Sequence, residues 1–224
     1  MRAMRASDHP HSRPLSRRAR GALWLLALLQ WPLVGWSACE DPPARRVNWL
    51  RCDKRGADLA GVDLREAVLT QANLRDAKLA GSRLAGADLG DATLTGADFT
   101  GATLTAARLV SAKLERAVFA GASMAGARLD RAALAGANFA GADLSGGRLY
   151  QADLAGADLS GAKLDKANLA QANLTDAKLP DAVLDGATLS RAVLENAVLT
   201  GARLRGAKLD GANLLAVDFT GADL

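Results

Sequence analysis

Five side chains in this sequence have types and spacing that suggest a binding surface. Arg108, Arg128 and Arg148 are 20 residues apart, and each of them precedes a leucine. Arg131 and Tyr150 lie close to this series along the chain. Guanidinium groups recognise carboxylates and phosphates, so we take these five residues as candidate partner-binding residues.

The spacing of the three arginines implies a particular neighbourhood. In a chain that repeats every 20 residues, they would lie in adjacent circuits, about 4.8 Å apart as neighbouring strands are. Like charges that close repel unless anions or a nearby carboxylate such as Asp130 relieve them. The series therefore indicates either a docking strip for an acidic partner or polyanion, or a solvated face screened by ions.

Residues that could support catalysis are scarce. The only histidines, His9 and His11, lie near the N-terminus, so Ser/His and Cys/His catalysis cannot be assembled in the rest of the chain. No Cys/His spacing typical of a metal site occurs, and the glycines do not form a phosphate-binding loop. We expect no enzymatic activity, no catalytic residues, no cofactor and no metal site.

Cys39 and Cys52 are the only cysteines, and three states are open to them. In an oxidising compartment, two cysteines at this separation suggest a disulfide. The segment Trp36-Ser37-Ala38-Cys39 is similar to a bacterial lipoprotein box, although Trp36 replaces the aliphatic residue expected there. Lipidation of Cys39 and two free thiols are therefore the alternatives to the disulfide.

The N-terminal segment has the pattern of an export signal. Arginines are frequent up to Arg20, an apolar stretch covers residues 22–34, and small residues follow. The apolar stretch is shorter than the roughly 20 residues of a membrane-spanning helix. We therefore expect residues 1–37 to be an export signal peptide and the protein to be periplasmic or secreted. A membrane-anchored form would require lipidation of Cys39 or an uncleaved signal.

The positive net charge is concentrated in that N-terminal segment. Residues 1–38 contain six arginines and one aspartate, whereas residues 56–224 contain 17 basic and 20 acidic residues. The main part of the chain is therefore slightly acidic, and the high isoelectric point does not indicate nucleic-acid binding. We expect no nucleic-acid partner.

From Gly56 to Leu224 the sequence repeats every five residues without interruption. The central position of each unit, which starts at residue 59, is Leu in 29 of 34 units, Phe in four and Met in one. Ala usually stands two residues before it, and Asp or Asn often stands immediately before it. Neither the helical period of 3.6 nor the strand period of 2 produces a strict period of five.

This A-(D/N)-L-x-G pattern resembles the pentapeptide repeat family. The resemblance implies an all-β fold, a right-handed quadrilateral β-helix in which four pentapeptides form one 20-residue coil, giving about 8.5 coils here. It also implies that the central residue and the small residue two before it point inward. Phe99, Phe119, Phe139 and Phe219 differ by multiples of 20, so we expect them on one wall.

Glycine also differs between the corners of such a coil. Gly61 and Gly81 belong to a corner that is almost always Gly, whereas Gln71 and Asp91 belong to one that rarely is. Because Gly adopts positive φ without a Cβ penalty, we expect type II turns at the first corner and other turn types at the second.

The ends of a solenoid need protection from solvent. We assign residues 38–55 to an N-terminal cap in which Trp49 and Leu50 cover the first coil, and residues 56–224 to the solenoid. At the other end the repeat continues to Leu224, so we expect either an end-to-end homodimer through the C-terminal coil or a frayed end.

These observations favour a non-enzymatic exported repeat scaffold that mediates protein–protein or envelope interactions through a solenoid wall or end. The family resemblance supplies an alternative, since some pentapeptide repeat proteins protect DNA gyrase by mimicking duplex DNA with an acidic rod. The weakly acidic repeats and the export signal do not favour that alternative. The partner itself is not indicated by the sequence.

Overall fold

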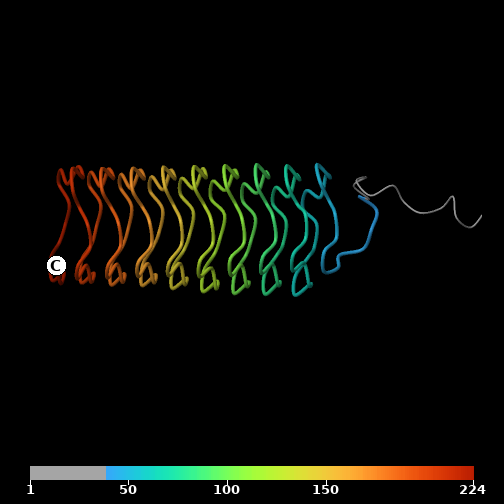
Figure 1. The fold of residues 1–224 in the computed structure, drawn as a ribbon, viewed down its shortest axis with the longest axis horizontal. Coiled ribbons are helices and arrows are strands. Elements are labelled where there is room, and N and C mark those ends of the chain that lie inside the picture. The colour runs from blue at the N-terminus through green and yellow to red at the C-terminus, as the bar shows by residue number, and fades with distance from the viewer. Residues whose placement is uncertain (1–38) are drawn as a thin grey trace, which may run out of the picture. The chain divides into compact units, whose positions relative to one another are not determined.

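The computed structural model describes residues 39–224. The predicted export signal, residues 1–37, lies outside the described residues. Residues 39–224 form a regular stack of coils that runs from the blue N-terminal coil to the red C-terminal coil (Figure 1). This part of the chain contains no helix, and each strand-like contact is a single-residue parallel β-bridge.

Every bridge joins residues that are 20 positions apart. The first pairs Asn48 with Val68, the last pairs Arg203 with Asp223, and a bridge residue occurs at every fifth position between them. Four five-residue walls therefore make one circuit, and the predicted 20-residue coil is confirmed. Hydrogen bonds run along the stack in both directions. The N–H of Leu69 donates to the C=O of Asp88 in the next coil at 2.7 Å, and that of Val68 donates to the C=O of Val47 in the preceding coil at 2.9 Å.

The interior is filled by the residues that the repeat places there. Central side chains from Leu64 to Leu199 are 0% exposed, and the alanines two positions before them are buried as well. The rings of Phe99, Phe119 and Phe139 stack in successive coils with centroids 4.8 Å apart, which confirms a shared wall. Burial of each leucine contributes about 1.5–3 kcal/mol before the loss of conformational entropy is subtracted.

The corners of the coil are all alike, so the prediction of different turn types was wrong. Gly61 has a φ of 67°, but Gln71 and Arg131 also have positive φ, at 58° and 57°. At each corner an N–H donates to the carbonyl three residues earlier, as from Ala72 to Leu69 at 3.0 Å, and φ is positive at the second central residue as in a type II turn. The ladders on both sides of a corner require the same change of direction, so residues other than Gly adopt this conformation at a cost of roughly 1–2 kcal/mol.

Where Asp or Asn precedes the central residue, its side chain completes the hydrogen bonding of that unit. Its Oδ1 accepts the N–H two residues later, at 3.0 Å between Asp158 and Ser160 and at 2.9 Å between Asn138 and Ala140. The ladder and the corner bond use the other four N–H groups of the unit. The Ser160 hydroxyl also donates to Asp158 and holds the pKa of that carboxyl below its usual range. The frequent Asp and Asn residues are thus explained by turn structure.

Coil geometry begins earlier than the recognisable repeat. Asn48 and Asp53 already form bridges with the following coil, within the segment that we assigned to a cap. Trp49 occupies an inward central position and is 1% exposed, whereas Leu50, expected to cover the coil, takes the outward position after it and is partly exposed. The next central residue is Lys54, whose Nζ lies 4.3 Å from the centre of the Trp49 ring. These two units escape notice in the sequence because neither central residue is Leu or Phe.

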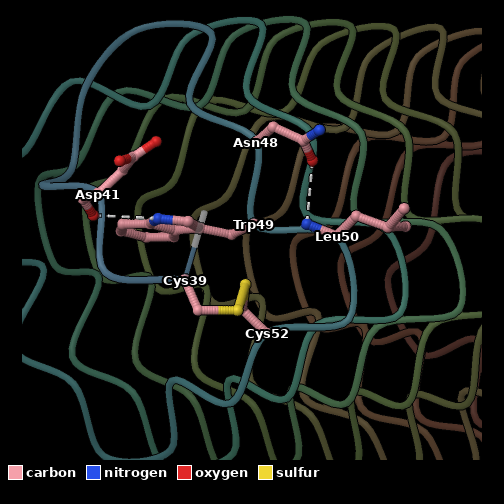
Figure 2. Close-up of a disulfide and its surroundings, with 6 residues drawn as sticks. All are labelled: Cys39, Asp41, Asn48, Trp49, Leu50 and Cys52. Carbon is pink, nitrogen blue, oxygen red and sulfur yellow. Dashed lines mark hydrogen bonds between the residues drawn. A yellow bond between two sulfur atoms is a disulfide. The ribbon is translucent and has the colours of Figure 1, made fainter. Parts of the chain in front are cut away.

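A disulfide between Cys39 and Cys52 joins the preceding segment to the first coil (Figure 2). The Cα atoms are 5.4 Å apart, and Cys52 is buried at the inward position that usually holds Ala. Near the disulfide, Trp49 Nε1 donates to the Asp41 carbonyl at 3.2 Å. Residues 39–224 contain no free cysteine, so in this structure the disulfide occupies the thiol that lipidation would need.

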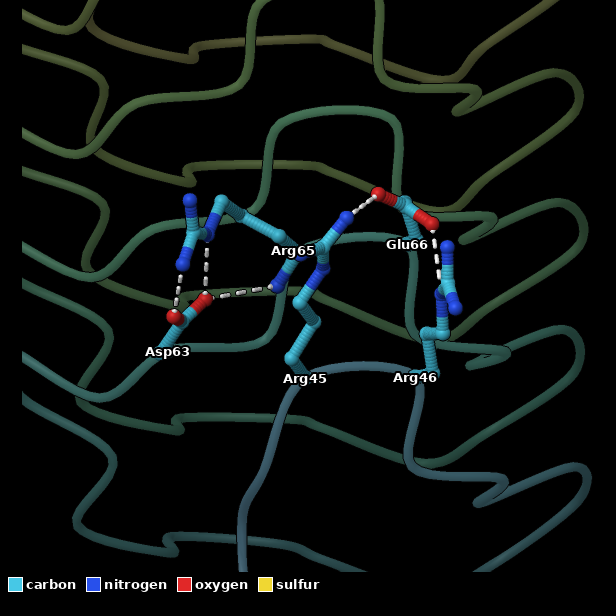
Figure 3. Close-up of polar contacts among 5 residues, drawn as sticks. All are labelled: Arg45, Arg46, Asp63, Arg65 and Glu66. Atoms are coloured by element: carbon cyan, nitrogen blue, oxygen red, sulfur yellow. Dashed lines mark hydrogen bonds and ion pairs between the residues drawn. The ribbon is translucent and has the colours of Figure 1, made fainter.

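Ion pairs fasten the same segment to the coil above it (Figure 3). Glu66 accepts hydrogen bonds from both Arg45 and Arg46, the latter through Nε at 2.7 Å. These bonds hold the pKa of the Glu66 carboxyl below its usual range. Nearby, Arg65 donates to Asp63 and lowers the pKa of that carboxyl strongly.

The last described coil exposes residues that are buried elsewhere. Leu214 and Leu224 occupy inward positions but are 38% and 72% exposed, and Leu215 on the outside is 63% exposed. Within the described residues, the backbone N–H of Leu214 has no ladder partner. This face is the surface on which the expected end-to-end homodimer depends.

Candidate anion-binding groove

The three arginines of the predicted strip lie in one column on the outside of one wall. Arg108 forms a β-bridge with Arg128, and Arg128 forms one with Arg148, so the three occupy equivalent places in successive coils. The stacked phenylalanines give the coil spacing as 4.8 Å. The regular fold therefore holds three positive side chains close together, which an isolated chain would not do.

Arg108 is neutralised by a partner of its own. Its Nη1 donates to both carboxylate oxygens of Asp88, at 3.1 Å each. Asp88 occupies the equivalent place one coil earlier, so the pair lies within the column. Arg108 therefore contributes little to any site farther along the wall.

Asp130 lies beside the other two arginines. Its Oδ1 is 3.4 Å from Arg148 Nε, and its Oδ2 is 3.8 Å from Arg128 Nε. The Asp130 side chain is 9% exposed, whereas those of Arg128 and Arg148 are 47% and 55% exposed. Both carboxylate oxygens are buried and accept no hydrogen bond, which is unusual for a buried charged group.

A cavity of about 230 Å³ opens over this carboxylate. Its lining consists of Val110, Arg128, Asp130, Arg131, Arg148, Tyr150 and Gln151. We call this cavity the Asp130 groove. Five of its residues follow the central position of their units, three of them directly and two at the corner beyond, so the groove runs from the arginine column towards the neighbouring corner of the coil.

Hydrogen bonds position the far side of the groove. Gln171, one coil farther on, accepts from Gln151 Nε2 at 3.0 Å and from the Tyr150 hydroxyl at 3.3 Å. The Tyr150 hydroxyl is thereby held beside Gln151 and Gln171, which occupy equivalent corners of adjacent coils. The groove is thus bounded by guanidinium groups on one side and by an aromatic ring on another.

The charges in the groove do not cancel. Arg128, Arg131 and Arg148 supply three positive charges and Asp130 supplies one negative charge, which leaves a local charge of +2. The half-exposed guanidinium groups present donors to solvent in a geometry suited to oxyanions. The groove can therefore bind an anionic group.

The structure brings together most of the residues that the sequence singled out. Arg128, Arg131, Arg148 and Tyr150 line one groove, and Arg108 lies outside it. Sequence reasoning omitted Val110 and Gln151. Both could have been found from the 20-residue period, because Val110 precedes Asp130 and Gln151 follows Arg131 in the same columns.

Other kinds of site have no counterpart in this part of the chain. Among residues 39–224, no group of three or more His, Cys, Asp or Glu side chains is arranged to hold a metal ion. A helix long and apolar enough to cross a membrane is likewise absent from these residues.

A four-walled β-helix with a filled interior and a polar outside is a repeat solenoid, a class of protein that presents extended surfaces. Eight copies of a family model described as Pentapeptide repeats match the chain between residues 51 and 224. The chain therefore belongs to the pentapeptide repeat family, whose fold is the right-handed quadrilateral β-helix. Members of this family are generally structural or interaction proteins without enzymatic activity.

Several solved structures are similar to this chain. HetL, a pentapeptide repeat protein involved in heterocyst differentiation regulation from the cyanobacterium Nostoc sp. strain PCC 7120, is 37% identical over 80% of this chain and 87% of HetL, with a TM-score of 0.47. A pentapeptide repeat protein from the Arabidopsis thaliana thylakoid lumen is 34% identical over 48% of this chain and 64% of its own, with a TM-score of 0.32. QnrB1, a plasmid-mediated fluoroquinolone resistance protein, is 21% identical over 81% of this chain and 91% of its own, with a TM-score of 0.47. No curated protein matches the chain.

Proposed function

We propose that this chain is a non-enzymatic, exported scaffold that binds an anionic partner through one wall of its solenoid. The observation that carries the proposal is the Asp130 groove, a cation-rich hollow on an otherwise regular wall. The interior beneath it is fully packed, since Leu129 and Leu149 are 0% exposed. The chemistry available to a ligand is therefore that of the outer side chains, which supports recognition rather than catalysis.

The distribution of charge supports this wall as the binding surface. Elsewhere, several arginines are paired with carboxylates on the same or the adjacent coil, as Arg65 is with Asp63 and Arg203 is with Asp185. In the groove, two arginines lie beside one buried carboxylate and a third arginine lines the same cavity. An acidic partner would relieve this local excess and would associate faster because of it.

Two features support export to the periplasm or beyond. The Arg-rich and apolar pattern of residues 1–37 is typical of a signal peptide, and a disulfide joins Cys39 to Cys52 of the first coil. An oxidising compartment preserves such a bond. Fractionation with N-terminal sequencing of the mature chain tests this part of the proposal, and an intact N-terminus in the cytosol would refute it.

Site-specific crosslinking tests the binding wall. A photo-crosslinking residue replaces Tyr150 in the full chain expressed in its host, and a matched variant carries it at Ala155, the equivalent place on the next wall of the same coil. The proposal predicts a discrete adduct from position 150, its loss when Arg128→Glu is added, and no such adduct from position 155. Equal adducts from both walls, or an adduct at 150 that is unaffected by Arg128→Glu, would contradict the proposal.

A further inference from the structure

We propose that the Asp130 groove binds a phosphate monoester, a dianionic phosphoryl group attached to an organic substituent. This inference rests on the proposed function as a binding module and names the chemistry that the groove recognises. It is carried by the way in which one buried carboxylate, two arginines of adjacent coils and an aromatic ring are placed around a single cavity.

Asp130 acts here as a positioning residue. The nitrogen that approaches its carboxylate is Nε in both Arg128 and Arg148, at 3.8 and 3.4 Å. Contact through Nε orients each side chain while leaving the terminal Nη groups for another acceptor. About half of each arginine side chain is exposed, and both side chains line the cavity.

The buried charge of Asp130 has no hydrogen-bond partner among the described residues. The two Asp130 oxygens are buried and accept no hydrogen bond from the protein, and the nearest nitrogens of Arg148 and Arg128 lie 3.4 and 3.8 Å away, longer than a usual hydrogen bond. A buried carboxylate in that condition is costly. An anion that binds the outer Nη groups would fix both guanidinium groups over the carboxylate, so that each serves the ligand and Asp130 together.

The charge selects a dianion. Arg128, Arg131 and Arg148 exceed Asp130 by two positive charges. A phosphate monoester carries up to two negative charges near neutral pH, and its three terminal oxygens can accept from guanidinium groups in different coils. A single carboxylate would neutralise only half of the excess.

The size and lining of the cavity select an ester rather than free phosphate. The cavity of about 230 Å³ has room for an organic substituent beside a phosphoryl group. Val110 and the Tyr150 ring supply apolar surface beside the arginines. An organic substituent attached to the phosphoryl group would contact these two side chains, which inorganic phosphate cannot do.

Tyr150 offers a direct reporter, since it is the only tyrosine in the chain. The full chain labelled with 3-fluorotyrosine therefore gives one fluorine resonance, located in the groove. Phenyl phosphate, inorganic phosphate, a glutamate-rich peptide, and phosphatidylcholine vesicles with and without phosphatidic acid are titrated separately. The variants are Arg128→Gln and Arg148→Gln, with Arg108→Gln as a matched control in the same column but outside the groove.

We expect a saturable shift of the resonance with phenyl phosphate. Either groove variant should weaken its affinity about tenfold through the loss of a charge-assisted hydrogen bond, and Arg108→Gln should leave it within about twofold. A similar shift with vesicles that contain phosphatidic acid, but not with phosphatidylcholine vesicles, would identify a lipid headgroup as the source of the phosphate monoester. No shift with either vesicle type would identify a soluble ester. Either result supports the proposal.

Three results would overturn the proposal. They are the absence of a saturable shift with phenyl phosphate, equal weakening by Arg108→Gln, and tighter binding of inorganic phosphate or the glutamate-rich peptide than of phenyl phosphate. If any of these occurs while crosslinking from position 150 still captures a partner, the ligand class is wrong but the proposed function stands. If phenyl phosphate binds and no partner is captured, the ligand class stands and the proposed function is wrong.

Discussion

The ring of Phe119 lies flat against the ring of Phe139 in the next coil, with centroids 4.8 Å apart and ring planes 5° apart. Two residues separated by 20 positions in the sequence are therefore direct neighbours in the core. The same register places Arg128 beside Arg148 on the outside. Core packing and the candidate site thus depend on one geometric relationship, and the predictions below test its consequences.

The wall that contains the phenylalanines should accept another aromatic ring. Leu159 follows Phe139 in that column. Leu154 belongs to a neighbouring wall, where the equivalent residues of the adjacent coils are leucines. We expect Leu159→Phe to change the free energy of unfolding by less than about 1.5 kcal/mol and Leu154→Phe to lower it by about 1–3 kcal/mol through overpacking. Urea unfolding of the two variants provides the comparison, and equal losses would argue against a specialised wall.

Two neighbouring corners provide a matched test of backbone strain. Ala106 has a φ of 55°, and Gly101, one unit earlier, has a φ of 63° with no atom within 4 Å of an added Cβ. Ala106→Gly should stabilise the protein by about 1 kcal/mol and Gly101→Ala should destabilise it by a similar amount, because only the conformational preference changes. Thermal or urea unfolding measures both. A stabilising Gly101→Ala would show that positive φ carries no cost here.

Acid should weaken the fold through the carboxylates that cap the turns. Hydrogen bonds from Ser145 and Ser160 hold the pKa values of Asp143 and Asp158 below their usual range. Because the folded pKa is lower than the unfolded value of about 3.9, these groups stabilise the protein above that pH and lose their contribution as the pH falls through the folded pKa. The urea midpoint should therefore decrease between about pH 5 and pH 2.

A non-titrating variant isolates this effect. In Asp143→Asn with Asp158→Asn, each side chain keeps an oxygen acceptor for the N–H two residues later but loses its charge. The acid-dependent decrease should become smaller than in the unsubstituted protein. An identical decrease in both proteins would assign acid sensitivity to other groups.

Loss of the disulfide should loosen the first coils and leave the later ones intact. Cys39→Ser with Cys52→Ala removes the bond and places Ala where the repeat usually has it. We expect a loss of about 3 kcal/mol, confined to the N-terminal end because each coil of a solenoid contacts only its neighbours. Hydrogen exchange should accelerate in residues 46–65 and remain unchanged in residues 146–165. Uniform acceleration along the chain would contradict a local role.

Much of the fold could be predicted because the residue type at the central position of each unit indicates that its side chain is buried. Leu at the central position and Ala two before it define the inward face, and the spacing of Phe99, Phe119 and Phe139 defines the length of the circuit. The first two units were missed because Trp49 and Lys54 replace the expected residues. The corners were mispredicted because the ladders, rather than local preference for Gly, determine φ at positions such as Gln71.

The candidate site was only partly predictable for a related reason. The period of 20 places Arg128 beside Arg148, but it does not distinguish them from Arg108, which is paired with Asp88. Nor does spacing show that Asp130 is buried without a hydrogen bond. These features depend on side-chain conformation across neighbouring columns, which a repeat pattern leaves undetermined.

The most direct test of the 20-residue circuit is a series of distances between spin labels on one outer column. Labels are placed in pairs at Thr103 and Val183, Thr103 and Arg203, and Arg83 and Arg203, which lie four, five and six coils apart. Pulsed electron paramagnetic resonance should give backbone separations of about 19, 24 and 29 Å, rising by about 4.8 Å per coil. Distances that do not increase in this even step for each 20 residues would contradict the account.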